Sequence, residues 1–575
     1  MSESSATVRH AWDLPAWYPA CPMDLTRVLL IAVIWVSQPA IAGGAPIHQN
    51  RPNVVLTGKG FLVAAQTTPE SSDATGRGSW ITAPFRFVFK YKWRFIIPFM
   101  IVMHILGFLT SIRAIMETRT SQGAIAWGIS LNTLPYFAVP AYWVLGQSKF
   151  SDYEIERLKD ILTDSERGRE TARILEEQGM LVAPQSDYER QQASMLEQLA
   201  KLPITRFNHA ELLIDGQETF DAIFAGIASA TDYILVQFYI MRDDVLGQRL
   251  KAALIDKARE GVRVYVLFDE LGSKQLSPEY IEELRGEGVL IYPFNTTQGG
   301  NRFRLNFRNH RKIVVVDGRI AYVGGSNVGD EYLGKHPTLT PWRDTHVAVQ
   351  GPVVQFVQVS FAEDWLWAVG SNPDWRQEAQ HELNWDPEKA PDGDMMALCL
   401  PTGPADELET CTLFMLLAIS SARERLWIVS PYFVPDEQLM SALQLAALRG
   451  VDVRILIPEN PDQKLVYYSS FSYLEDAEKA GVKIYRYLDG FLHQKVMLVD
   501  SRFSTIGTAN FDNRSMRLNF EVTMLIGDEE FASEVEAMLE EDFSNSRLVS
   551  AKEYTEASFG FRFLVRVARL MAPVQ

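Results

Sequence analysis

The segment HRKIVVVDGRIAYVGGSN at residues 310–327 returns as HQKVMLVDSRFSTIGTAN at residues 493–510. In both copies a lysine follows the histidine by two positions, an aspartate by seven, a glycine by fourteen and an asparagine by seventeen. Chance alone would place such a lysine and aspartate after one of the nine histidines only about 0.03 times. The two segments are therefore copies of one unit.

The sequence around these segments repeats as well. Residues 233–240 (YILVQFYI) and 425–433 (RLWIVSPYF) have the composition of buried strands, and each precedes a helical stretch, a glycine and a second apolar strand. Strand, helix and strand at these spacings predict α/β units with partly parallel sheets. We expect two similar α/β domains, residues 206–375 and 376–575, related by a pseudo-two-fold axis that brings two half-sites together.

Each motif supplies groups suited to phosphoryl chemistry. Strand periodicity places His310 and Lys312 on one face, and likewise His493 and Lys495. A lysine in an apolar strand is costly unless an anion such as phosphate pairs with it. One imidazole can attack phosphorus and form a phosphohistidine, while the opposite imidazolium protonates the leaving alcohol. Purely structural histidines and solvated lysines are the alternative.

The other repeated polar residues complete the candidate site. Asp317 and Asp500 are either turn residues or polar supports, and Asn327 and Asn510 are candidate ligands of the substrate phosphate. The predicted catalytic residues are His310, Lys312, Asp317, His493, Lys495 and Asp500. The three cysteines lack metal-binding spacing and no His/Cys/carboxylate cluster is evident, so we expect no metal and no cofactor.

Length and charge restrict the class of protein. A chain of 575 residues is long enough for three or four structural units, and its 47% apolar and 22% charged residues are typical of a folded protein. The net charge of −17 argues against a protein that binds nucleic acid by broad phosphate neutralisation. We therefore expect no nucleic-acid partner.

Two apolar runs predict a transmembrane helical hairpin at residues 93–147. Residues 95–112 (FIIPFMIVMHILGFLTSI) and 124–145 (AIAWGISLNTLPYFAVPAYWVL) contain no charged residue, and each is long enough to cross about 30 Å of hydrocarbon. Buried core helices are the alternative. Lys90, Lys92 and Arg94 precede the hairpin and favour a cytoplasmic location for this flank, and hence for the catalytic domains.

Three further segments flank these domains. Residues 1–92 form an extension in which residues 24–42 resemble a signal peptide, and its cleavage would place the catalytic domains on the other side of the membrane. Residues 148–205 are expected to form an acidic helical linker. Residues 559–571 (FGFRFLVRVARLM) predict an amphipathic helix with Arg562, Arg566 and Arg569 on one face and its apolar side toward lipid or the catalytic core. At a membrane the arginines would meet anionic lipid, and a plain packing helix is the alternative.

Both motifs resemble the HxKxxxxD signature of the phospholipase D superfamily, and their context is similar to bacterial cardiolipin synthases. The resemblance covers roughly residues 93–575 and includes NFRNHRK (306–312), GGSN (324–327), DEYLG (330–334), WRDT (342–345), VSPYFVPD (429–436) and NRSMRLNFE (513–521). Departures are Gly325 and Thr508, where the superfamily often has serine, and the long N-terminal extension.

This resemblance implies a fold and an activity. It implies two phospholipase D-like α/β sandwich domains in a multi-pass protein of the bacterial inner membrane. The family transfers a phosphatidyl group from one phosphatidylglycerol to another and releases glycerol, so phosphatidylglycerol and anionic membrane lipids are the expected partners. By position, Asp344 and Glu521 correspond to the acidic residues that orient the histidines. His310 would be the nucleophile and His493 the general acid and base, although near symmetry permits the reverse.

Other activities stay open at this point. A membrane phospholipase D, or another transphosphatidylase with a different acceptor, would use the same motifs. A catalytically silent membrane scaffold needs none of the six motif residues that the chain retains. A nuclease is disfavoured by the hairpin and the net negative charge.

Overall fold

The computed structural model describes residues 83–575 apart from 119, 147–149, 151–152, 154–165, 185, 295–305 and 371–382. The predicted extension, including the signal-like segment 24–42, lies almost entirely outside the described residues. Residues from Pro84 onward form one compact unit.

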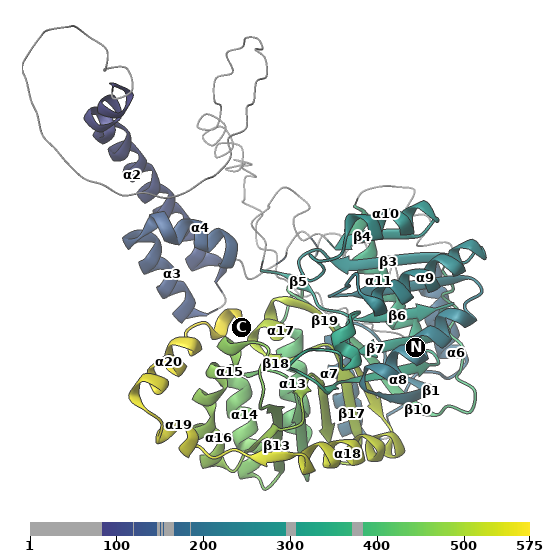
Figure 1. Ribbon diagram of the computed structural model, residues 1–575. Coiled ribbons are helices and arrows are strands. Elements are labelled where there is room, and N and C mark those ends of the chain that lie inside the picture. The colour runs from purple at the N-terminus through teal and green to yellow at the C-terminus, as the bar shows by residue number, and fades with distance from the viewer. Residues whose placement is uncertain are drawn as a thin grey trace, which may run out of the picture. The chain divides into compact units, whose positions relative to one another are not determined.

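The apolar N-terminal region is a long helix followed by two short ones. Helix α2 spans Ala83–Glu117, α3 Ser121–Thr133 and α4 Pro135–Leu145 (Figure 1). Within the described residues, only Arg94–Glu117 is a helix long and apolar enough to cross a membrane. Gly107 lets α2 approach the backbone of Leu131 in α3, because a Cβ at this position would overlap the Leu131 carbonyl.

The second predicted span, residues 124–145, is not one continuous helix. Leu134, with φ −132° and ψ 55°, separates α3 from α4. A proline lacks the N–H of a helical hydrogen bond and disfavours helical geometry at the residue before it, so Pro135 begins a new helix. The first run is thus one long helix and the second is helical in two pieces, so a hairpin that crosses the membrane twice stays a prediction.

The predicted acidic linker is helical where the structure describes it. Helices α6 (Glu166–Glu177) and α7 (Asp187–Ala200) precede the first strand, β1, at Thr205. Earlier in the linker, Phe150 and Tyr153 are buried in an aromatic cluster with Phe307 and Phe520. The linker is thus packed against the catalytic part of the chain.

The chain from β1 onward is built on one sixteen-stranded mixed sheet that contains two copies of a seven-strand pattern. The first copy has β1 (Thr205–Ile214), β2 (Tyr233–Phe238), β3 (Arg263–Asp269), β4 (Leu290–Phe294), β6 (Ile313–Val316), β7 (Ile320–Gly324) and β9 (Thr345–Gln350). The second has β10 (Met395–Thr402), β11 (Arg425–Val429), β13 (Asp452–Pro458), β14 (Lys483–Tyr487), β16 (Val496–Val499), β17 (Phe503–Gly507) and β19 (Asn519–Gly527), and β20 (Ser546–Leu548) adds an edge.

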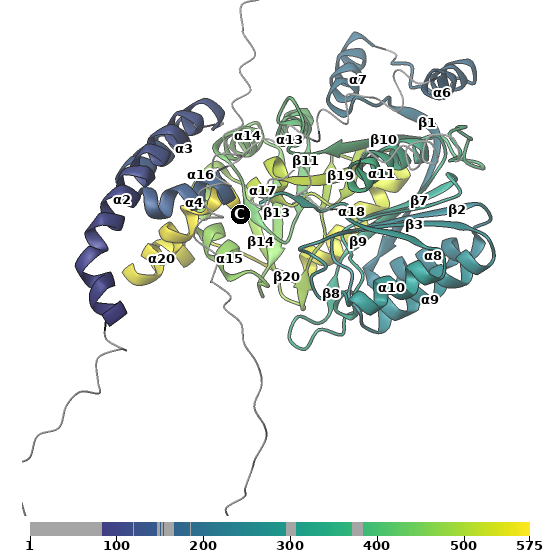
Figure 2. The ribbon, with the colours of Figure 1, turned by 90° about the horizontal axis from the view of Figure 1, so that it is seen from above.

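The strand order reveals the predicted pseudo-two-fold relation. The order β4-β3-β2-β6-β7-β9-β1 in one lobe matches β14-β13-β11-β16-β17-β19-β10 in the other, and β1 pairs antiparallel with β10 at the centre. Figures 1 and 2 show the two lobes side by side on this continuous sheet. The two lobes therefore repeat one strand pattern on either side of the β1–β10 pair.

Helices cover both faces of the sheet. In the first lobe they are α8 (Asp215–Ser229), α9 (Val245–Arg259), α10 (Pro278–Gly286) and α11 (Val354–Val369). In the second they are α13 (Thr410–Ser421), α14 (Glu437–Leu448), α15 (Lys464–Ser470), α16 (Leu474–Ala480), α17 (Asn513–Arg517), α18 (Glu529–Ser544), α19 (Lys552–Thr555) and α20 (Phe559–Arg569). Alternate residues of β2 enter different cores: Ile234 packs in one, whereas Leu235 packs in the other.

Candidate active site

Two short parallel ladders cross between the lobes and position the histidines. Strand β5 (Arg308–Asn309) pairs with the start of β19, and β15 (Phe491–Leu492) pairs with β8 (Trp342–Arg343). His310 then donates its backbone N–H to the Phe520 carbonyl at 2.8 Å, and His493 donates to the Arg343 carbonyl at 2.7 Å. Each histidine therefore lies beside a carboxylate of the opposite lobe.

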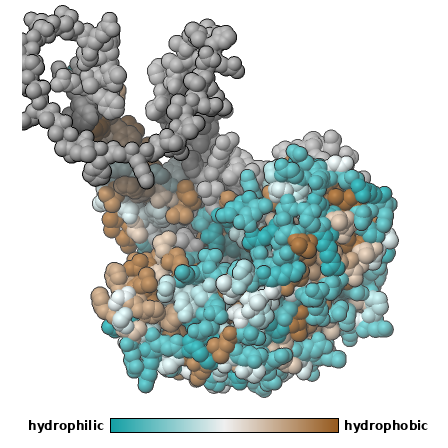
Figure 3. All heavy atoms as spheres, in the orientation of Figure 1, coloured by the Kyte–Doolittle hydropathy of each residue, from teal (hydrophilic) through white to brown (hydrophobic). Residues whose placement is uncertain are grey.

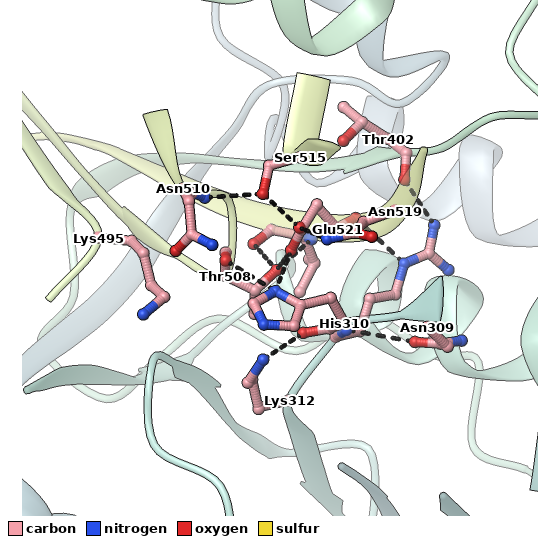
Figure 4. A network of polar contacts seen from close by, with 12 residues as sticks. Asn309, His310, Lys312, Thr402, Lys495, Thr508, Asn510, Ser515, Asn519 and Glu521 are labelled. Atoms are coloured by element: carbon pink, nitrogen blue, oxygen red, sulfur yellow. Dashed lines mark hydrogen bonds and ion pairs between the residues drawn. The ribbon is translucent and has the colours of Figure 1, made fainter. Parts of the chain in front are cut away.

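His310 is held by Glu521. Its Nδ1 lies 2.9 Å from Glu521 Oε2, which also accepts a 2.6 Å hydrogen bond from the Thr508 hydroxyl (Figure 4). The other oxygen, Oε1, accepts from the Ser515 hydroxyl at 2.8 Å and from the Asn519 amide at 3.0 Å. Four donors fix this carboxylate, so the imidazole that it holds has one orientation.

His493 is held by Asp344 in the mirrored arrangement. Its Nδ1 lies 2.8 Å from Asp344 Oδ2, while Oδ1 accepts from the backbone N–H of Thr345 at 2.9 Å. The ring packs against Trp342, with centroids 5.3 Å apart. When Nδ1 donates its proton to the carboxylate, Nε2 of each ring is left with a lone pair. Asp344 and Glu521 thus make the contacts that the resemblance implied.

The two motif lysines are buried next to the histidines. Lys312 Nζ donates to the carbonyl oxygen of His310 at 2.6 Å, and Lys495 Nζ donates to that of His493. Arg311 turns the other way and forms a 2.9 Å ion pair with Asp364. Since β6 begins only at Ile313, His310 and Lys312 precede the strand, but they share one side of the chain as predicted.

Burial controls the protonation of the site. It lowers the pKa of His310 to about 4 and that of His493 to about 3, with Lys495 adding to the second shift. Burial also lowers the pKa of Lys312 and brings that of Lys495 to about 8. Among the described residues, no ion pair within 4.0 Å joins either ammonium group to a carboxylate. An anion between the lysines would offset their desolvation.

The two motif asparagines have different surroundings. Asn327 accepts from the Ile240 N–H at 3.0 Å and donates to the Tyr332 hydroxyl at 2.8 Å, which links two loops of the first lobe. Asn510 Oδ1 is buried without a hydrogen-bond partner in the described part of the chain. Asn510 is therefore the better placed of the two for contact with a ligand.

The two motif aspartates support strands rather than reacting atoms. Asp317, at φ 52°, accepts hydrogen bonds from three consecutive backbone N–H groups at 2.8 to 2.9 Å, and Asp500, at φ 53°, does the same at 2.8 to 3.2 Å. The donors are Thr231, Asp232 and Tyr233 for the first, and Arg423, Glu424 and Arg425 for the second. Each aspartate lies at the far end of the motif strand from the histidine, so it is a positioning residue.

The sequence did not identify the side chains that donate hydrogen bonds to Glu521 or the aromatic ring that packs near His310. Ser515 and Asn519 lie in the NRSMRLNFE segment, so their proximity to Glu521 in sequence was a usable signal. Tyr239, whose ring centroid lies 4.9 Å from that of His310, follows the buried strand β2 and carried no such signal.

Gly325 is a sensitive position, because a Cβ there would overlap the Asp344 carboxylate. We expect Gly325→Ala to displace Asp344 from His493 and lower kcat about tenfold or more, since the orienting contact would be lost. Thr508→Ala is the matched control at the equivalent position and should have a smaller effect, because three donors to Glu521 remain. Steady-state kinetics on lipid vesicles measure both. Equal activity of Gly325→Ala and the parent would contradict this role.

Comparison with known proteins agrees with this geometry. A family model described as cardiolipin synthase, PLD-like domain, matches residues 223–365 and 415–543. Cardiolipin synthase A of Pseudomonas putida (strain GB-1) is 47% identical over 82% of this chain and 97% of its own length. Cardiolipin synthase A of Pseudomonas fluorescens (strain SBW25) is 47% identical over 83% of this chain and 98% of its own length.

A solved structure shares the fold. The phosphatidylserine synthase of Haemophilus influenzae Rd KW20 superposes with a TM-score of 0.53 at 18% identity, over 67% of this chain and 99% of that one. The family model and the extensive identity to the Pseudomonas proteins place the duplicated motif in a known lineage of phosphatidyltransferases. The chain belongs to the cardiolipin synthase family of bacterial membrane proteins, within the phospholipase D superfamily.

Proposed function

We propose that this enzyme joins two phosphatidylglycerol molecules through a phosphohistidine on His310. The observation that carries the proposal is the pair of carboxylate-held imidazoles beside two buried lysines. In the first step His310 Nε2 bonds to phosphorus and the bond from phosphorus to the glycerol headgroup breaks. His493, which takes up a proton when the lipid phosphate binds, donates that proton to the departing oxygen. Lys312 and Lys495 stabilise the nonbridging oxygens, and the Asn510 side chain contacts the bound substrate.

In the second step another phosphatidylglycerol replaces the released glycerol. His493 removes the proton from the terminal hydroxyl of this second lipid. The hydroxyl oxygen attacks phosphorus, and the phosphorus–nitrogen bond to His310 breaks. The products are cardiolipin and a regenerated enzyme, so two phosphatidylglycerol molecules give one cardiolipin and one glycerol. The assignment of His310 as nucleophile is supported by the three other side chains that donate hydrogen bonds to Glu521, because a rigid nucleophile loses little freedom on attack.

The membrane arrangement belongs to the same proposal. Helix α2 spans the bacterial inner membrane, and α3 with α4 forms the returning arm of the hairpin in two pieces. Lys90, Lys92 and Arg94 keep the N-terminal flank of α2 in the cytoplasm, so an even number of crossings places the catalytic lobes there as well.

Incubation with one lipid tests the reaction. Purified protein supplied only with phosphatidylglycerol should form cardiolipin and glycerol in equal amounts, and it should carry acid-labile, base-stable phosphate during turnover. Phosphatidic acid without cardiolipin would instead assign the chain to the phospholipase D alternative, with water as acceptor.

Proton uptake on anion binding should follow from the lowered histidine pKa values. The free site holds both imidazoles neutral near pH 6.5, since their pKa values are about 4 and about 3. A bound phosphate anion raises these pKa values, so the complex takes up about one proton and affinity increases as the pH falls. Calorimetry of inorganic phosphate binding in two buffers of different ionisation enthalpy measures the uptake. Binding without proton exchange would contradict it.

A further inference from the structure

The C-terminal helix α20 presents its apolar side to the outside of the catalytic unit. Phe559 and Leu570 are each 77% exposed, Phe563 is 61% exposed and Val567 is 42% exposed. Their spacings of four, four and three residues put them on one helical face. Figure 3 shows apolar side chains gathered where Figure 1 places α20. Contiguous exposed apolar surface of this kind marks a site of interaction with a membrane or a protein.

A different face of α20 fixes the helix to the protein. Val565 and Ala568 are buried, and Phe561 packs edge-on against Phe471 with ring centroids 5.2 Å apart. The Ser558 hydroxyl caps the helix by accepting from the Phe561 N–H. Rotation of α20 to bury its outer apolar face would break these inner contacts, so the outer face stays exposed.

The three arginines occupy the border between these two faces. Arg566 donates to the Tyr554 hydroxyl at 2.7 Å, Arg569 lies 4.8 Å from the Tyr473 ring centroid, and Arg562 is exposed. The helix therefore directs one apolar side outward, whereas the sequence left open whether its apolar side faces lipid or the catalytic core. Residues 559–571 contain no acidic residue, although the whole chain has a net charge of −17.

We propose that α20 is a second membrane contact, which lies along the bilayer surface with Phe559, Phe563, Val567 and Leu570 among the acyl chains. The arginines at its border then meet the phosphates of anionic lipids. A bilayer fits this surface better than a second copy of the chain, because a self-association through α20 would bring two rows of arginines together without acidic partners. The chain is also a membrane protein whose relatives are named for a lipid product.

Depth-dependent quenching in the full-length protein tests the contact without relying on catalysis. Phe563→Cys, in a Cys21→Ser background that leaves the buried Cys399 and Cys411, is labelled with a fluorophore and reconstituted into vesicles containing phosphatidylglycerol. Lipids with a quencher just below the headgroups should quench this label strongly. The same label at Ser533→Cys, an exposed site on α18, should stay bright. An unquenched label at residue 563 would overturn the proposal.

A matched pair of surface variants measures the consequence for activity. Phe559→Ser combined with Phe563→Ser and Leu570→Ser should raise the apparent KM for phosphatidylglycerol in vesicles about tenfold or more, because the lipid-facing surface is lost. Activity on short-chain phosphatidylglycerol in micelles should stay within twofold of the parent. The control, Leu445→Ser with Leu448→Ser, alters the similarly exposed leucines of α14 and should leave both activities unchanged.

Two results would reject the membrane as the partner. One is an equal effect of the two variant sets on vesicle activity. The other is a concentration-dependent dimer in detergent that the α20 variant abolishes, since this would assign the surface to a second copy of the chain. The quenching experiment is independent of turnover, so it remains decisive even if the proposed phosphatidyl transfer proves wrong.

Discussion

Replacing His310 by Asn is expected to lower cardiolipin formation by about 10⁴-fold or more, because the imidazole that forms the phosphorus–nitrogen bond is lost. His493→Asn should reduce the rate to a similar extent with phosphatidylglycerol as donor. The two variants should differ with a donor whose leaving group needs no proton, such as phosphatidyl p-nitrophenol. His493→Asn should then release a rapid burst of about one nitrophenolate per enzyme, and His310→Asn should release none.

This comparison also decides which of the two histidines is the nucleophile. A burst from His310→Asn together with its absence from His493→Asn would reverse the assignment and make His493 the nucleophile. Phosphate bound to the enzyme after the burst should be acid-labile and base-stable. Far-ultraviolet circular dichroism of both variants controls for folding, since each removes a buried side chain.

The crossed carboxylates should have the next largest effects. Glu521→Gln and Asp344→Asn should each lower kcat about 10²- to 10⁴-fold, because an amide in place of the carboxylate favours the wrong imidazole tautomer. Each change acts on the histidine of the opposite lobe. With the activated donor, Glu521→Gln should slow the burst, whereas Asp344→Asn should leave its rate close to that of the parent.

A matched control keeps this prediction specific. Thr508→Val removes one of the four donors to Glu521 and should lower kcat about tenfold or less, since the carboxylate itself remains. Stopped-flow absorbance with the activated donor measures the burst in all three variants. Slower bursts in Asp344→Asn than in Glu521→Gln would show that the carboxylates do not act on the histidines across the lobes as proposed.

The sequence was sufficient to predict the repeat, the α/β class and the two histidine–lysine pairs of the site. The motif spacing of His310 and Lys312 is local information, and it repeats at His493 and Lys495. The match between strand orders in the two lobes follows from the same repeat. Alternation along an extended chain also predicted which motif side chains share one side, even though they precede the strand.

Other features depended on distant contacts that no local pattern encodes. Glu521 and His310 are 211 residues apart in sequence, and the ladder between β5 and β19 brings them into contact. Asp317 and Asp500 were expected near the chemistry, but a strand places them at its opposite end. The outward direction of α20 depends on which of its faces packs against Phe471.

The crossed ladders have a mechanical consequence for the catalytic cycle. Because β5 pairs with β19 and β15 pairs with β8, any sliding of one lobe past the other would separate both imidazole–carboxylate pairs at once. The continuous sheet through β1 and β10 resists the same movement. The two half-sites are therefore mechanically coupled, so that they form together and come apart together.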